Sequence, residues 1–125
     1  MITIREERLD NGLQILFVDQ SNRYFGDYHR VCIQILLVFA LDDLPVTSGD
    51  DEAFRDNAIA RLGKELKVVK RLERMGVPTA AVEGVRQSMI EAFMENSFPY
   101  LNRPEYPRSL ADAELKKRRT HSFYG

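Results

Sequence analysis

The feature that most constrains the fold is the segment 31–41, in which almost every residue is apolar. Alternate positions, which share one face of a β-strand, are all apolar: Val31, Ile33, Ile35, Leu37, Phe39 and Leu41. Leu36, Val38 and Ala40 make most of the opposite face apolar too. A strand that is apolar on both sides is usually central, or is covered on its second side by a helix or another subunit. The segment therefore predicts a central strand with two faces to bury.

A β-hairpin is predicted ahead of this strand. Residues 2–9 and 13–19 have strand character, and Asp10-Asn11-Gly12 lies between them. Asn-Gly suits the two positive-φ positions of a type I′ turn, whose twist matches a tight hairpin. Residues 20–30 are polar with a central Gly26, and they predict a loop or an irregular hairpin connection.

A helix is expected after the loop 44–49, capped by Ser48 or Asp50 and ending near Gly63. The following residues, 64–77, fit either a continued helix or a strand. A strand over about 65–76 is favoured because Gly63 precedes it and Gly76 and Pro78 follow it.

The C-terminal third predicts two helices. Thr79 is expected to cap a helix from about Ala80 to Glu95, and a short last helix is expected over 110–119, with 120–125 a frayed tail. The three prolines of 96–108 argue against a helix there. The order β-β-β-α-β-α-α predicts one α+β domain over residues 1–125. We expect about four mostly antiparallel strands, with helices packed on one face.

Composition excludes several classes of protein. The chain has 125 residues, the size of one domain, and no apolar run approaches the ~20 residues of a membrane span. The N-terminus lacks the pattern of a signal peptide. Cys32 is the one cysteine, which excludes an internal disulfide, and the net charge is −1. These features predict a cytoplasmic protein of bacterial type, with no membrane partner and no global field that would attract nucleic acid.

No catalytic motif is complete. The chain contains no phosphate-binding glycine loop, no dinucleotide fingerprint and no nucleophile elbow, so neither catalytic residues nor a cofactor is predicted. His29 and Cys32 form a lone H-x-x-C, whose side chains would point to opposite faces of a strand. No metal site is predicted from this pair.

The segment 19–30 is the densest in chemically active side chains, and it supports a small-molecule-binding or enzymatic hypothesis. The candidate ligand-binding residues are Asp19, Ser21, Arg23, Asp27, His29 and Arg30. An arginine could hold an anionic group, and Asp27 or His29 could move a proton. The favoured alternative is a solvated loop whose polar groups make turn hydrogen bonds.

The leading hypothesis is a non-catalytic interaction module that binds itself, as a homodimer, or another protein. It rests on Leu16, Leu36 and Val38, which helices on a single face would leave uncovered. The aromatic–proline stretch 98–108 adds a composition typical of interfaces, with Phe98, Tyr100 and Tyr106 as candidate contacts. The favoured alternative for this stretch is a connector whose aromatic rings fill the edge of the core.

Binding of RNA or another polyanion through residues 64–74 and 116–119 is the least favoured hypothesis. On a helix, four cations would form one stripe: Lys64, Lys67, Arg71 and Arg74. On a strand they divide between two faces, where lysines discourage edge-to-edge aggregation.

Three short motifs resemble those of a group of small uncharacterised bacterial proteins. They are Asp10-Asn11-Gly12-Leu13, Asp19-Gln20-Ser21 with Gly26-Asp27, and Ser97-Phe98-Pro99-Tyr100-Leu101 with Pro104 and Pro107. The resemblance implies a self-standing domain and no particular activity. The D-x-S-x-x-G signature of PilZ domains is matched only in part, since Gly26 comes two positions too late.

Overall fold

The computed structural model describes residues 2–124, with side chains as far as Lys117. Within these residues one antiparallel sheet contains five strands: β1 (Ile2–Arg8), β2 (Gln14–Asp19), β3 (Asn22–Phe25), β4 (Tyr28–Ala40) and β5 (Glu65–Pro78). The helices are α1 (Gly49–Leu62), α2 (Val82–Leu101) and α3 (Tyr106–Tyr124), with short 3-10 turns η1 (Leu41–Asp43) and η2 (Thr79–Ala81). The predicted α+β class with an antiparallel sheet is confirmed.

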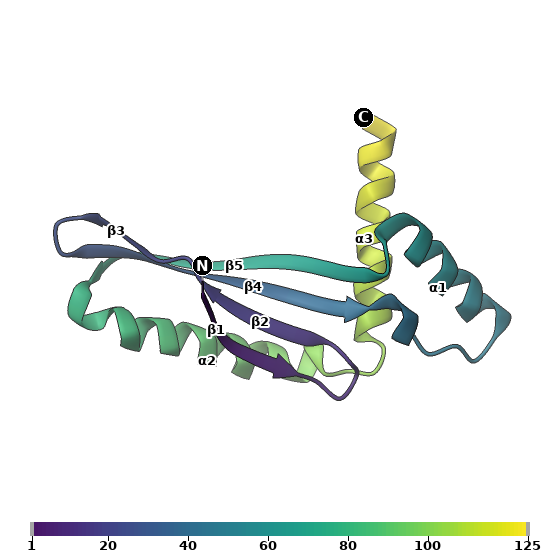
Figure 1. Ribbon diagram of the computed structural model, residues 1–125, viewed down its shortest axis with the longest axis horizontal. Coiled ribbons are helices and arrows are strands. Elements are labelled where there is room, and N and C mark those ends of the chain that lie inside the picture. Colours follow the sequence, from purple (N-terminus) through teal and green to yellow (C-terminus); the bar gives the residue numbers. More distant parts are fainter. Residues whose placement is uncertain (1, 125) are drawn as a thin grey trace.

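β4 is the central strand, as predicted. Along one edge its 13 residues pair with β3 and then β2, and along the other edge they pair with β5. β1 extends the sheet beyond β2, so that β1 and β5 are its outer strands (Figure 1). The ambiguity over 64–77 is resolved as a strand.

Of the two predictions for residues 20–30, a loop or an irregular hairpin connection, the structure has the second, because the short strand β3 forms an irregular hairpin with β4. The four residues of β3, two polar and two aromatic, form a strand because the long β4 offers its edge to them, with Asn22 opposite Arg30 and Phe25 opposite Tyr28. All four are exposed, so the alternating apolar pattern that marks a buried strand is absent.

The β1–β2 connection corrects a prediction. A type I′ turn needs a positive φ at Asn11, and no described residue other than glycine has one. Gly12 has φ 91°, and its N–H donates to the Leu9 carbonyl at 3.0 Å. The Asn11 side chain instead donates to the carbonyls of Leu101 (2.7 Å) and Arg103 (2.8 Å), so this turn holds the C-terminal end of α2.

α2 lies across one face of the sheet (Figure 1). The side chains of Leu13, Ile15, Ile33, Ile35 and Leu37 on this face are completely buried. Phe93 of α2 meets Phe17 edge to face at 5.9 Å. α1 and α3 pack together near the end of β4 (Figure 1). As predicted, Ser48 caps α1 and Gly63 ends it.

The C-terminal helices are longer than predicted. α2 continues through Pro99, which stands in its last turn, where a missing N–H costs little more than one hydrogen bond. α3 begins at Tyr106, so Pro107 lies in its first turn, where proline is favoured. α3 is longer than the helix predicted over 110–119, and the frayed tail expected over 120–125 stays a prediction. Thr79 does not cap α2: its N–H and hydroxyl donate to the Asp27 carbonyl at 3.0 and 3.3 Å.

Candidate interaction surface

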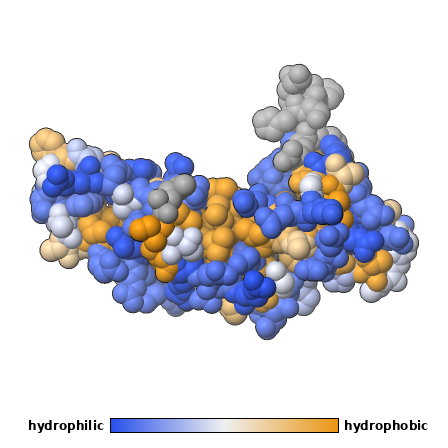
Figure 2. Space-filling view, viewed as in Figure 1, coloured by the Kyte–Doolittle hydropathy of each residue, from blue (hydrophilic) through white to orange (hydrophobic). Residues whose placement is uncertain are grey.

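The sheet has one face opposite α2, which we call the open face. In Figure 1, β1 and β2 pass in front of α2, so the view is onto this face, with α1 and α3 at one end of the sheet. Strand register places Glu6, Leu16, Leu36 and Val69 side by side across β1, β2, β4 and β5. We call these four residues the central row. Figure 2, from the same side, shows hydrophobic residues gathered over the middle of the sheet.

The uncovered apolar surface is concentrated in the central row. Val69 is 51% exposed, and Leu16 and Leu36 are partly exposed. Val18 and Val38, in the two neighbouring rows, are already buried at 7% and 8%. Of the three sheet residues predicted as interface, Leu16 and Leu36 are therefore left uncovered, whereas the chain itself buries Val38.

The charges beside the central row differ at its two ends. At the β1 end lies Glu6, which accepts a hydrogen bond from the Gln14 amide. At the β5 end Lys67 and Arg71 flank Val69 on the same face, because side chains alternate along a strand. Both are exposed, and neither forms an ion pair with a described residue. The central row thus ends in the carboxylate Glu6 at β1, with Arg8 beside it, and lies between two cations at β5.

The polar residues predicted to bind a ligand have separate partners. Asp19 accepts a hydrogen bond from the Ser21 N–H at 2.9 Å and pairs with Arg86 at 3.2 Å. The Ser21 hydroxyl accepts from the backbone N–H of Cys32 at 3.0 Å. These contacts fix the end of β2 to α2 and to β4, which is a structural role.

The remaining candidates lie at the β3–β4 end of the sheet. Nε2 of His29 lies 3.0 Å from the Thr79 hydroxyl, and Arg30 pairs with Glu73 at 2.9 Å. Arg23 lines a shallow hollow at the hairpin tip, and Asp27 contributes its backbone carbonyl to the Thr79 contact. The six residues are therefore distributed over both faces of the sheet. Among the residues with described side chains, no group of three or more His, Cys, Asp or Glu could hold a metal.

The tip of the β3–β4 hairpin exposes hydrophobic side chains that the sequence analysis did not single out. Tyr24 is 47% exposed, Phe25 73%, Tyr28 46% and, on the adjacent part of β5, Met75 54%. The three aromatic residues around Gly26, which are Tyr24, Phe25 and Tyr28, could have predicted this surface. The sequence analysis overlooked them because the segment as a whole is polar.

The aromatic–proline stretch divides between core and surface. Tyr106 is buried at 6% and meets the Tyr100 ring edge to face at 5.1 Å, with Arg103 over Tyr100 at 5.4 Å. Phe98 and Tyr100 are 41% and 54% exposed. Tyr106 therefore fills the edge of the core, whereas Phe98 and Tyr100 remain on the surface.

The basic residues do not form one stripe in the part of the chain with described side chains. On β5, Lys67 and Arg71 lie on the open face, and Lys70 and Arg74 on the opposite one. In α3, Lys117 pairs with Glu114 at 3.2 Å, and Lys116 pairs with Asp112 at 3.0 Å. The side chains of Arg118 and Arg119, also predicted for polyanion binding, lie outside the described residues.

The chain matches no protein-family model, no curated protein and no solved structure. Within residues 2–124, none of the helices combines the length and the apolar character needed to cross a membrane. The functional argument therefore starts from the geometry of the surfaces.

Proposed function

We propose that the chain is a non-catalytic interaction module that forms a homodimer by packing its open face against that of a second copy. The observation that carries this proposal is the central row, in which Val69 is exposed and Leu16 and Leu36 are partly exposed on a four-strand surface. Two sheets packed face to face bury such residues in a layer about 10 Å thick.

The charges support one symmetric arrangement. A two-fold axis parallel to the strands, between β2 and β4, places β1 over β5 of the second copy and β2 over β4. Leu16 then meets Leu36 of the second copy, and Glu6 lies over the strand that carries Lys67 and Arg71. Arg8, the other charged residue on this face of β1, shares a row with Lys67 and therefore lies over the Lys67 of the second copy.

The alternative two-fold axis runs across the strands. It would place each strand over its own counterpart, with Glu6 facing Glu6 and Lys67 facing Arg71. Like charges across an interface disfavour a pairing. The first arrangement has one like-charge pair, Arg8 over Lys67, but of the two it alone places Glu6 among cations, so it is the more complementary.

The expected dimer is weak and depends on concentration. Stable interfaces bury roughly 800 Å² per partner. Here two of the three apolar residues of the central row are already partly buried within the chain. We expect a dissociation constant on the order of micromolar rather than an obligate dimer.

Sedimentation equilibrium from about 1 to about 300 µM tests the proposal, because this range spans the expected dissociation constant. The wild-type protein should move from monomer to dimer. Val69→Glu should remain monomeric, because in the proposed arrangement Glu6 of the second copy lies directly over this position. Lys70→Glu is the matched control, because this neighbouring residue points to the opposite face and should leave association unchanged. A wild-type monomer over the whole range would contradict the proposal.

We also propose a cytoplasmic location in a bacterial type of cell. The support is Cys32, the one cysteine of the chain, which is a buried free thiol on β4. Such a thiol suits a reducing compartment. Fractionation of the source cells tests this, and recovery from an oxidising compartment would contradict it.

A further inference from the structure

A groove runs between β5 and α2 on the covered side of the sheet. It is widely open to solvent and has a volume of about 380 Å³, and Leu72, Met89 and Phe93 supply its apolar lining. β5 is an outer strand, so the groove opens sideways to solvent. Small-molecule sites are commonly mostly apolar hollows of roughly 300–1,000 Å³ with a few polar groups, and this groove lies at the lower end of that range.

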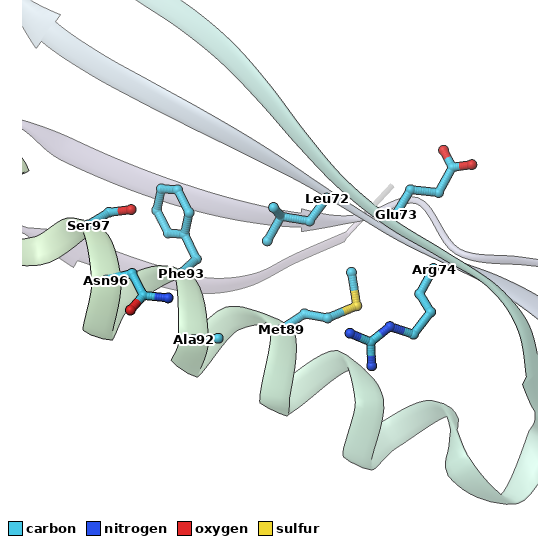
Figure 3. Close-up of a pocket in the computed structure, with 8 residues that line it drawn as sticks. All are labelled: Leu72, Glu73, Arg74, Met89, Ala92, Phe93, Asn96 and Ser97. Carbon is cyan, nitrogen blue, oxygen red and sulfur yellow. The ribbon is translucent and has the colours of Figure 1, made fainter.

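Arg74 supplies a cation at one end of this groove. It lies two residues after Leu72 and therefore on the same face of β5. Figure 3 shows its side chain extending toward α2 beside Met89. Its guanidinium forms no hydrogen bond or ion pair with any described residue. It is therefore available to bind an anion.

The other charged residue of the lining does not neutralise Arg74. Glu73 extends away from the groove in Figure 3 and pairs with Arg30 on the open face at 2.9 Å. At the other end of the groove, Asn96 and Ser97 of α2 provide an amide and a hydroxyl. The groove thus has an unpaired cation at one end, an apolar middle, and neutral hydrogen-bonding groups at the far end.

We propose that this groove binds a small organic anion with an apolar body. The anionic group pairs with Arg74, and the body lies against Leu72, Met89 and Phe93. A planar guanidinium binds a carboxylate, sulfonate or phosphate through two parallel hydrogen bonds. The site is independent of the proposed dimer, because it lies on the opposite face of the sheet.

Two related fluorescent probes test the role of the charge. Anilinonaphthalene sulfonate has an apolar aromatic body and one anionic group, whereas phenylnaphthylamine has a similar body and no charge. Both should bind the wild-type protein. Arg74→Gln should weaken binding of the sulfonate about tenfold, as expected for loss of one charged contact, and leave the neutral probe unchanged.

Arg71→Gln is the matched control, because Arg71 lies three residues earlier on the open face. It should change the binding of neither probe. Arg74 is exposed, so its replacement should not prevent folding, and an unchanged thermal transition would verify this. Equal effects of the two substitutions, or no sulfonate binding to the wild-type protein, would overturn the proposal.

A second variant locates the site without altering charge. Ala92 is exposed and lines the groove, so Ala92→Trp should fill it and reduce binding of both probes more than tenfold. Gln87→Trp, at an exposed position of α2 outside the lining, should leave both affinities unchanged. Unaltered binding to Ala92→Trp would place the probes elsewhere and overturn the proposal. Val69→Glu, the variant designed to be monomeric, should retain the site, so failure of the dimer and failure of the groove are distinguishable.

Discussion

The two faces of the sheet share their central strand but differ in what surrounds it. On the covered face, Ile35 and Leu37 of β4 are completely buried beneath α2, whereas Leu36, between them in sequence, is partly exposed on the open face. The composition of β4 does not distinguish these faces. The apolar residues of β5 do, because Leu66, Val68 and Leu72 lie on the covered face, whereas each face carries two of its cations. The apolar residues of a flanking strand therefore show which side of an apolar strand the chain covers itself.

The largest expected effect is a difference in the free energy of unfolding between substitutions on the two faces. Leu37→Ala should destabilise the monomer by about 3 kcal/mol, because it leaves a cavity in the core, whereas Leu36→Ala should cost only about 1 kcal/mol. Urea unfolding at concentrations below dimer formation measures both values. Equal costs would mean that the two faces are equally buried.

A smaller effect concerns how α2 is held over the covered face. Asn11→Ala removes the bonds to the carbonyls of Leu101 and Arg103 and should cost about 1–2 kcal/mol. Asp10→Ala changes the neighbouring exposed residue and should cost less than about 0.5 kcal/mol. Urea unfolding again provides the measurement. If the two variants were equally stable, the turn would not hold the helix.

The end of the covered face where α1 meets α3 should respond to acid. Asp51 accepts hydrogen bonds from the N–H and hydroxyl of Thr47 and from Arg108, and these contacts lower its pKa from 3.8 to about 2. Because the folded-state pKa is depressed, the stabilisation is present above pH 3.8 and is lost as the pH falls toward 2. Asp51→Asn should remove this part of the acid sensitivity, whereas Asp50→Asn, at a residue that makes none of these bonds, should retain it. Unfolding measured from neutral pH to pH 2 compares the variants, and identical profiles would contradict this role of Asp51.

The smallest effect on stability is expected on the open face. Val69→Thr keeps a β-branched side chain of similar size, so the free energy of unfolding of the monomer should change by less than about 0.5 kcal/mol. The added hydroxyl should nevertheless weaken dimerisation several-fold, because the proposed interface would bury it. Sedimentation and urea unfolding of the same sample separate the two quantities. A large loss of monomer stability would indicate that the chain already covers Val69.

The sequence predicted the elements that local patterns specify. The central strand, the strand after Gly63 and the Ser48 cap are confirmed because apolar alternation and capping chemistry act over a few residues. β3 was predicted only as one of two alternatives because it forms through pairing with β4 and carries no apolar alternation. The prolines of 96–108 gave a wrong prediction, because their effect on a helix depends on position. Pro99 and Pro107 lie in terminal turns, where a helix tolerates proline.

The candidate surfaces were less predictable. Leu16 and Leu36 were identified from their strands, but Val69 joins them only through the register of β5 against β4. Arg74 lines the groove because α2, the next α-helix along the chain, folds back against β5. Register and helix placement depend on long-range packing, which spacing along one chain does not specify.

The most direct test of the open-face dimer uses two complementary charge reversals. Glu6→Lys places like charges opposite each other in the proposed arrangement, as does the double variant Lys67→Glu with Arg71→Glu, so each protein alone should be monomeric. When the two are mixed, both copies of residue 6 again face residues of opposite sign at positions 67 and 71, and sedimentation should show a heterodimer about as stable as the wild-type dimer. A mixture that remains monomeric, while the wild-type protein dimerises, would contradict the account.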